Sequence, residues 1–248
     1  LLIKNLQAVS SPAYQINANA YLALNTNANA VTLEKNADLQ QSIASITKLM
    51  NAVVAVENIE QGRMITLTQQ MLEPEGQSPS LYIGRAISRD DLLKAAMIQS
   101  VNDAAESLAH TIGKEQFVTL MNQKAQSLGM QNTLFVDAHG LNPNNKSTAR
   151  DLAKLVAYVY KNHPEILAMS KQNDFWLPDA TGRSLKFQNV NNFYYLSQFM
   201  GGKTGYLPEA RQNIASLFTI KGNPTIVIVL NSANRQADVL SILRTLEK

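Results

Sequence analysis

Three short motifs in this sequence combine a hydroxyl with an amine or an amide, the groups that nucleophilic acyl transfer requires. One of these motif types, serine–x–asparagine, is present a second time at Ser232-Ala233-Asn234, so a single motif carries little information and we expect this copy to be structural. The informative feature is the ordered set, together with the elements that carry it. In chain order the three motifs are Ser45-Ile46-Thr47-Lys48, Ser100-Val101-Asn102 and Lys203-Thr204-Gly205.

The first motif opens a helix that the apolar pattern predicts over residues 43–59. Lys48 lies one turn after Ser45, on the same face of that helix. The positive end of the helix dipole and the apolar neighbours Ile46 and Leu49 both favour the neutral form of the Lys48 amine. A neutral amine beside a hydroxyl is a general base for a serine nucleophile. Taken singly, a serine here is more often a helix cap, and a lysine more often reaches solvent.

The other two motifs carry groups that are suited to holding a substrate. Ser100 and Asn102 interrupt the helical pattern of residues 90–112, where a hydroxyl can relay a proton and an amide can hold a peptide carbonyl. Lys203 and Thr204 follow two glycines, just before an expected strand. A cation and a hydroxyl on a strand edge can bind a carboxylate, while the strand backbone aligns the substrate as an added strand. Each motif alone is more often an ordinary polar turn.

Composition narrows the classes of function. The 248 residues carry a net charge of +3 without a run of basic residues, so nucleic acid is not an expected partner. There is no cysteine, which excludes disulfides, thiol catalysis and cysteine-bound metals. His110, His139 and His163 are scattered, so we expect structural roles for them, no metal and no cofactor. The longest strongly apolar run, residues 226–230, is too short to span a bilayer.

Strands are expected at both ends of the chain and helices in the middle. This order predicts an α/β fold of the α+β type, an antiparallel sheet flanked by helices, with an all-helical lobe at roughly residues 65–165 inserted between its strands. We expect residues 1–248 to form a single domain, with the tail helix packed on the sheet. The strands are predicted over residues 20–24, 30–33, 214–220 and 225–230, and the helices over 90–112, 114–128, the stretch after Thr148 and 236–246.

The motifs and their surroundings resemble the low-molecular-mass penicillin-binding proteins, the D-alanyl-D-alanine carboxypeptidase and endopeptidase family. The ordered set S-x-x-K, S-x-N and K-T-G is a signature that these proteins share with β-lactamases. The likeness runs over nearly the whole chain and implies a β-lactamase/transpeptidase-like form of the fold. It is carried by Ala44–Met50, Asp91–Leu93 with Gln99-Ser100, His139–Leu141, Ser147–Leu152 and Gly202–Tyr206.

The resemblance implies a serine peptidase that cleaves D-alanyl bonds in peptidoglycan stem peptides and is acylated by β-lactam antibiotics. Ser45 would form the acyl-enzyme, and Lys48 would accept its proton. Ser100 and Asn102 would assist proton transfer and hold substrate. The remaining implied residues are Lys203, Thr204 and Gly205, which would bind the substrate and its terminal carboxylate, and Ser45 and Tyr206, whose backbone amides would form the oxyanion hole.

Alternatives remain open for the bond that is cut. The chain ends at its last predicted helix, without the second β-rich domain and anchoring tail of many carboxypeptidases, which favours an endopeptidase over a carboxypeptidase. Arg211 and Val101 differ from the common residues of the family and bear on substrate preference. A class A β-lactamase needs a deacylating glutamate, and no E-x-x-L-N-like segment lies between Asn102 and Lys203. A non-hydrolytic β-lactam sensor or peptidoglycan-binding domain would keep all three motifs.

The compartment follows from the resemblance and not from the composition. The N-terminus has no charged segment followed by an apolar stretch, so no signal peptide is expected within this numbering. The chain is then either cytoplasmic or, as the resemblance implies, periplasmic or extracytoplasmic after removal of a signal peptide. The sequence leaves the oligomeric state open.

We predict that Ser45→Ala abolishes covalent labelling by a penicillin, because the variant has no hydroxyl to form the acyl-enzyme. Gel detection of a fluorescent penicillin on the purified protein measures this. Labelling that survives the substitution would remove Ser45 as the nucleophile.

Overall fold

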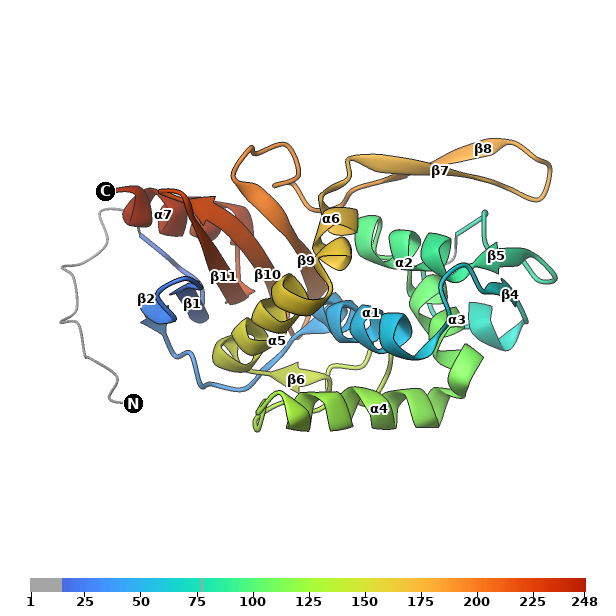
Figure 1. Ribbon diagram of the computed structural model, residues 1–248, viewed down its shortest axis with the longest axis horizontal. Helices are drawn as coiled ribbons and strands as arrows, with labels where there is room; N and C mark the ends of the chain where they lie inside the picture. The colour runs from blue at the N-terminus through green and yellow to red at the C-terminus, as the bar shows by residue number, and fades with distance from the viewer. Residues whose placement is uncertain (1–14, 77) are drawn as a thin grey trace.

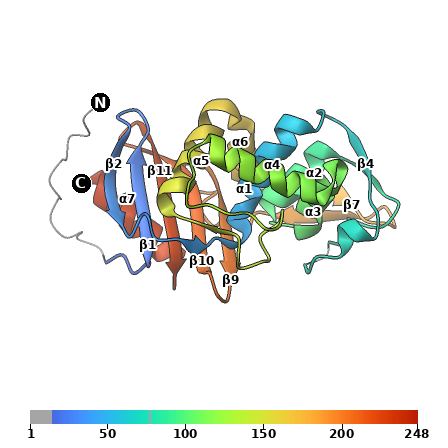
Figure 2. The same ribbon diagram turned by 90° about the horizontal axis from the view of Figure 1, so that it is seen from below.

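A five-stranded antiparallel sheet forms one half of the computed structural model, which describes residues 15–76 and 78–248. The N-terminal segment, in which no signal peptide is expected, includes residues 1–14, which lie outside the described residues. The strand order is β2-β1-β11-β10-β9, so strands from the two ends of the chain lie side by side (Figure 2). These strands are β1 (Ala20–Asn25), β2 (Ala30–Lys35), β9 (Phe199–Leu207), β10 (Arg211–Ile220) and β11 (Asn223–Ser232).

Both faces of the sheet are covered by helices, which confirms the expected fold class. In β11 the side chains of Ile226 and Ile228 belong to one apolar cluster, and those of Val227 and Val229 belong to the other. This alternation follows from the period of two of a β-strand. Helix α5 (Ala149–Asn162) contacts β1, β10 and β11, and α7 (Arg235–Glu247) contacts β10 and β11. The tail helix therefore packs on the sheet, as the sequence predicts.

The other half of the molecule is helical and follows the sheet along the long axis (Figure 1). Its helices and those that join it to the sheet are α1 (Thr47–Asn58), α2 (Arg89–Ile98), α3 (Asn102–Ile112), α4 (Lys114–Ser127) and α6 (Pro164–Lys171). Short elements complete the fold: the 3-10 helices η1 (Ala44–Ile46) and η2 (Gln70–Leu72), and the paired strands β3 (Gln41–Ser42) with β6 (Lys146–Ser147), β4 (Met64–Thr66) with β5 (Ala86–Ser88), and β7 (Asp174–Pro178) with β8 (Ser184–Gln188).

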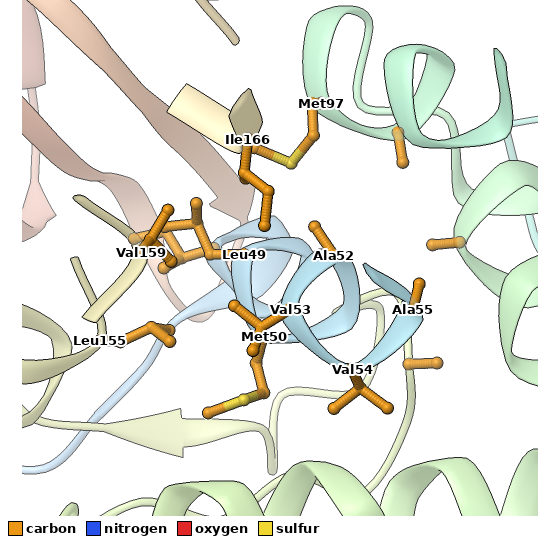
Figure 3. Packing of buried hydrophobic residues seen from close by; sticks show 14 of the residues in the cluster. Leu49, Met50, Ala52, Val53, Val54, Ala55, Met97, Leu155, Val159 and Ile166 are labelled. Atoms are coloured by element: carbon orange, nitrogen blue, oxygen red, sulfur yellow. The ribbon is translucent and has the colours of Figure 1, made fainter. Parts of the chain in front are cut away.

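Helix α1 lies at the centre of the larger apolar cluster. Every residue from Thr47 to Ala55 is buried, and apolar side chains leave the helix in several directions (Figure 3). They meet Met97 of α2, Leu155 and Val159 of α5, and Ile166 of α6. A helix that is buried on all sides keeps any polar group it carries away from water.

Several boundaries differ from the sequence prediction for local physical reasons. The helix expected from residue 43 begins as an α-helix only at Thr47, because Ala44 has φ +49°, which the right-handed helix does not allow. Pro164 ends α5 as expected but also starts α6, since proline is tolerated in the first turn of a helix. The K-T-G motif lies within β9 and not before a strand. Helix α6 and the β7–β8 hairpin were not predicted.

We predict that Ile242→Ala on α7 lowers the free energy of unfolding by about 2–5 kcal/mol, since a fully buried side chain is lost from the sheet–helix contact. Urea denaturation followed by circular dichroism measures the change. Ala237→Ser, at an exposed position of the same helix, is the matched control and should change stability little. Equal stability of Ile242→Ala and the parent protein would contradict the packing of α7 on the sheet.

Candidate active site

The fold brings the three motifs together at the junction of the sheet and the helices. The Lys48 Nζ atom is within hydrogen-bond distance of Ser45 Oγ at 3.0 Å and donates to Asn102 Oδ1 at 2.7 Å, which joins the first motif to the second. Lys203 Nζ donates to Ser100 Oγ at 2.8 Å, which joins the third motif to the second. The Ser232–Asn234 copy has other partners: Ser232 Oγ donates to Asp238, and Asn234 caps α7. That copy is structural, as expected.

Two glycines allow other segments to contact the main chain at Ser45, because glycine has no side chain. A Cβ atom on Gly140, which has φ +92°, would lie 2.2 Å from the Ala44 carbonyl oxygen. A Cβ on Gly205 would lie 2.6 Å from the Ile43 carbonyl oxygen and 3.1 Å from the Ser45 nitrogen. Gly140 and Gly205 therefore bring a loop and the edge strand β9 against the turn that carries Ser45. For Gly205, this contact is the geometric reason for the glycine of the K-T-G motif.

Lys48 is fully buried, and burial lowers the pKa of its amine to about 7, although the charge of Asp137 acts in the opposite direction. A neutral amine has two hydrogens and one lone pair. Two of its three neighbours accept only: the His139 carbonyl at 2.5 Å and Asn102 Oδ1, whose amide nitrogen donates to the Glu75 carbonyl. The lone pair is left facing the Ser45 hydroxyl, which can donate, so the geometry is that of a base and its nucleophile.

The second motif lies in the break between α2 and α3, where the sequence predicts an interruption. Ser100 has φ +64°, a conformation that costs a non-glycine residue free energy and is common at functional sites. The main chain on either side is held by bonds from Val101 N to the Ala95 carbonyl and from Val190 N to the Ile98 carbonyl, each 3.1 Å. This geometry directs the Ser100 hydroxyl to Lys203. Val101 itself is buried in the core.

The third motif contributes a second buried lysine. Burial, and then the nearby charges of Lys48 and Arg235, hold the pKa of Lys203 well below its usual range. The ion pairs formed by the described residues include none of these three cations. Three basic side chains without an acidic partner favour an anionic ligand, whose charge would stabilise their protonated forms.

Sequence reasoning missed Arg235. Its guanidinium donates to the Gly205 carbonyl at 3.3 Å, next to the K-T-G motif. It also lines a cavity of about 400 Å³ together with Tyr206, Gln212 and the start of α7. No local sequence pattern predicts a role for this arginine at the site, because it reaches β9 only when α7 packs on the sheet. Arg211, which we expect to bear on substrate preference, is exposed at the β9–β10 turn.

The loop of residues 136–145 supplies the carbonyl that contacts Lys48. The buried carboxylate of Asp137 accepts from the backbone amides of His139, Gly140 and Asn142 at 3.0, 2.5 and 2.7 Å, and from the Asn145 side chain at 2.7 Å. These bonds hold the loop in one conformation with the His139 carbonyl toward Lys48. Within the described residues no group of three or more His, Cys, Asp or Glu side chains is arranged to hold a metal ion.

Comparison with known proteins gives a consistent result. The sequence matches the family described as D-alanyl-D-alanine carboxypeptidase over residues 5–234. It is 32% identical over 240 residues to the D-alanyl-D-alanine endopeptidase of Escherichia coli (strain K12), covering 92% of this chain and 76% of that protein. It is 35% identical over 242 residues to the D-alanyl-D-alanine endopeptidase of Pseudomonas aeruginosa, covering 91% and 76%.

A carboxypeptidase and a solved structure are also similar. The D-alanyl-D-alanine carboxypeptidase DacA of Haemophilus influenzae is 29% identical over 229 residues, 87% of this chain and 57% of that protein. The crystal structure of the D-alanyl-D-alanine carboxypeptidase from Mycobacterium tuberculosis H37Rv has a TM-score of 0.88 at 22% identity, over 96% of this chain and 94% of that chain. This likeness confirms the expected fold. Among the described helices, none combines the length and the apolar character that crossing a membrane requires.

We predict that acylation of Ser45 by a penicillin becomes faster with rising pH, with a midpoint near the Lys48 pKa of about 7. The neutral amine is the active base, and its fraction grows as the pH passes through the pKa, so the rate should be about tenfold higher at pH 8 than at pH 6. Stopped-flow or quenched-flow labelling over this range measures the midpoint. A rate that is constant between pH 6 and pH 8 would contradict a base with this pKa.

Proposed function

This chain belongs to the D-alanyl-D-alanine carboxypeptidase family, and we propose that it is a serine peptidase that hydrolyses D-alanyl bonds of peptidoglycan, chiefly those of the cross-links. The observation that carries the chemistry is the Lys48 amine, buried and bonded to two acceptor-only oxygens and to the Ser45 hydroxyl. The two relatives named endopeptidases, each over 30% identical, support the cross-link as the substrate bond. Removal of a terminal D-alanine is the alternative, supported by the carboxypeptidase relative.

In the first half-reaction the Ser45 oxygen bonds to the D-alanyl carbonyl carbon while the neutral Lys48 amine takes the hydroxyl proton. The backbone N–H groups of Ser45 and Tyr206 stabilise the negative oxygen of the tetrahedral intermediate, each such donor being typically worth about 3 kcal/mol. The carbon–nitrogen bond then breaks. We assign to Ser100 the transfer of the proton from the Lys48 side to the leaving nitrogen, since its hydroxyl accepts from Lys203 and its motif also carries Asn102, which accepts from Lys48.

In the second half-reaction water replaces the serine. The neutral Lys48 amine accepts a proton from the water as the hydroxide attacks the ester carbonyl, and the proton returns to the Ser45 oxygen as the ester bond breaks. The products are the peptide with a new carboxylate and the unmodified enzyme. A β-lactam enters the same first step, and its opened ring stays attached when deacylation is slow. Slow release fits the lack of an E-x-x-L-N-like segment between Asn102 and Lys203.

The substrate carboxylate provides the anion that the site lacks. We assign its binding to Lys203 and Thr204, with Arg235 adding positive charge from α7. The strand β9 is at the edge of the sheet, where an extended peptide can pair with it, although the Gly202 N–H already donates to Ser170 Oγ and the Thr204 carbonyl accepts from Lys203. Asn102, which already bonds to Lys48 and to the Glu75 carbonyl, chiefly orients the base.

The same proposal covers the setting of the enzyme. The sheet contributes β9 and the helical half contributes Lys48 and Ser100, so both halves act as one peptidase domain. Peptidoglycan lies outside the cytoplasmic membrane, so the enzyme works in the periplasm or another extracytoplasmic space. Its partners are stem peptides, with β-lactams as covalent inhibitors.

We predict that the purified protein converts cross-linked dimeric wall fragments to monomers, measured by mass spectrometry, and that Ser45→Ala does not. Release of terminal D-alanine from pentapeptide monomers alone would replace the endopeptidase by a carboxypeptidase. If neither product forms while a penicillin still acylates Ser45, the protein is a sensor or binding domain.

A further inference from the structure

A buried carboxylate that the mechanism does not use lies close to the active site. Glu106 of α3 is 1% exposed. Its Oε1 atom accepts from Lys114 Nζ at 2.8 Å and is 3.2 Å from His110 Nε2. Its Oε2 atom has no hydrogen-bond partner and lies 3.6 Å from His139 Nε2. A buried carboxylate oxygen without a donor is costly, so its orientation toward His139 calls for a reason.

His139 connects Glu106 to the base. Its Nδ1 atom accepts from the backbone N–H of Leu141 at 3.2 Å, so in the neutral ring the proton is on Nε2, the nitrogen that faces Glu106. The main-chain carbonyl of the same residue accepts from Lys48 Nζ at 2.5 Å. One residue therefore presents its ring to α3 and its carbonyl to α1.

We propose that Glu106 is a positioning residue for Lys48: it holds the His139 ring, and thereby the carbonyl that takes one hydrogen of the Lys48 amine. The proposal rests on the assignment of Lys48 as the base of the proposed peptidase. If the carbonyl moves, the amine can turn and its lone pair no longer faces Ser45. A small loss of alignment at a nucleophile–base pair slows the reaction strongly.

The His139 ring is neutral chiefly because it is buried. The groups that face it are Asp137 on its own loop, Lys48 on α1, Glu106 on α3 and Lys114 on α4. Burial is the largest effect and lowers the pKa of His139 despite the two carboxylates. At neutral pH the ring is therefore neutral, with its Nε2–H facing Glu106 Oε2 at 3.6 Å. The charge that bears on the pKa of Lys48 is that of Asp137, and Glu106 contacts the His139 ring and not the amine, so we expect it to act on the base by position.

This distinction gives the test. In the full chain, Glu106→Gln should slow acylation of Ser45 by a fluorescent penicillin about tenfold to a hundredfold, with the pH midpoint unchanged near the Lys48 pKa of about 7. Glutamine has one oxygen where glutamate has two, so it cannot present an acceptor to Lys114 and another to His139, and one contact is lost. His139→Ala should slow the reaction to the same degree, and the double variant should be no slower than either single variant.

Matched controls separate position from stability. Lys114→Met removes the other partner of Glu106 and should leave the acylation rate near that of the parent. If Glu106→Gln does not fold, as judged by thermal melting, Glu106→Asp retains the charge and withdraws the carboxylate from His139, and the same slowing is expected.

Three results would overturn the proposal: an unchanged rate in a folded Glu106 variant, a shifted pH midpoint, or additive effects of the Glu106 and His139 substitutions. Failure of the proposed function is a separate result. If the parent protein is acylated normally but cleaves no wall fragment, the peptidase assignment falls and the positioning of Lys48 by Glu106 stands.

Discussion

The structure depends on one constraint, a lysine amine kept away from water and surrounded by acceptors that carry no charge. Helix α1 meets this constraint because it is buried on all sides, so Lys48 cannot extend to solvent. Its hydrogen-bond partners are a hydroxyl, an amide oxygen and a backbone carbonyl. A carboxylate in direct contact would instead stabilise the charged amine and remove the base.

The surrounding segments come from distant parts of the chain, and each has a reason to be there. Gly140 and Gly205 permit a loop and a strand to contact the turn at Ser45 more closely than any side chain allows. Asp137 holds that loop through four hydrogen bonds, and its carboxylate does not contact Lys48 directly. The loop thus orients the base without a direct ion pair, which is compatible with a pKa of about 7 for Lys48.

The same site gathers three basic side chains without an acidic partner in the described part of the chain before a ligand binds. After burial, the charges of Lys48 and Arg235 lower the pKa of Lys203, and the ion pairs among the described residues include none of the three. A substrate with a carboxylate next to the bond that is cut would relieve this repulsion on binding. Binding of the substrate carboxylate and the protonation of the two lysines are then linked through charge.

The sequence by itself determined the chemistry and the local elements. The three motifs, the helix break at Ser100, the Thr148 cap and the β10–β11 hairpin all follow from hydrogen bonds and periodicities within a few residues. Only the tertiary structure decided the positions of Arg235, of the His139 carbonyl and of Glu106, because packing brings them to Gly205, Lys48 and His139, which are dozens of residues away in the chain. The pattern of neighbouring residues cannot predict such contacts, because they form only when the buried faces of α3, α7 and the sheet come together.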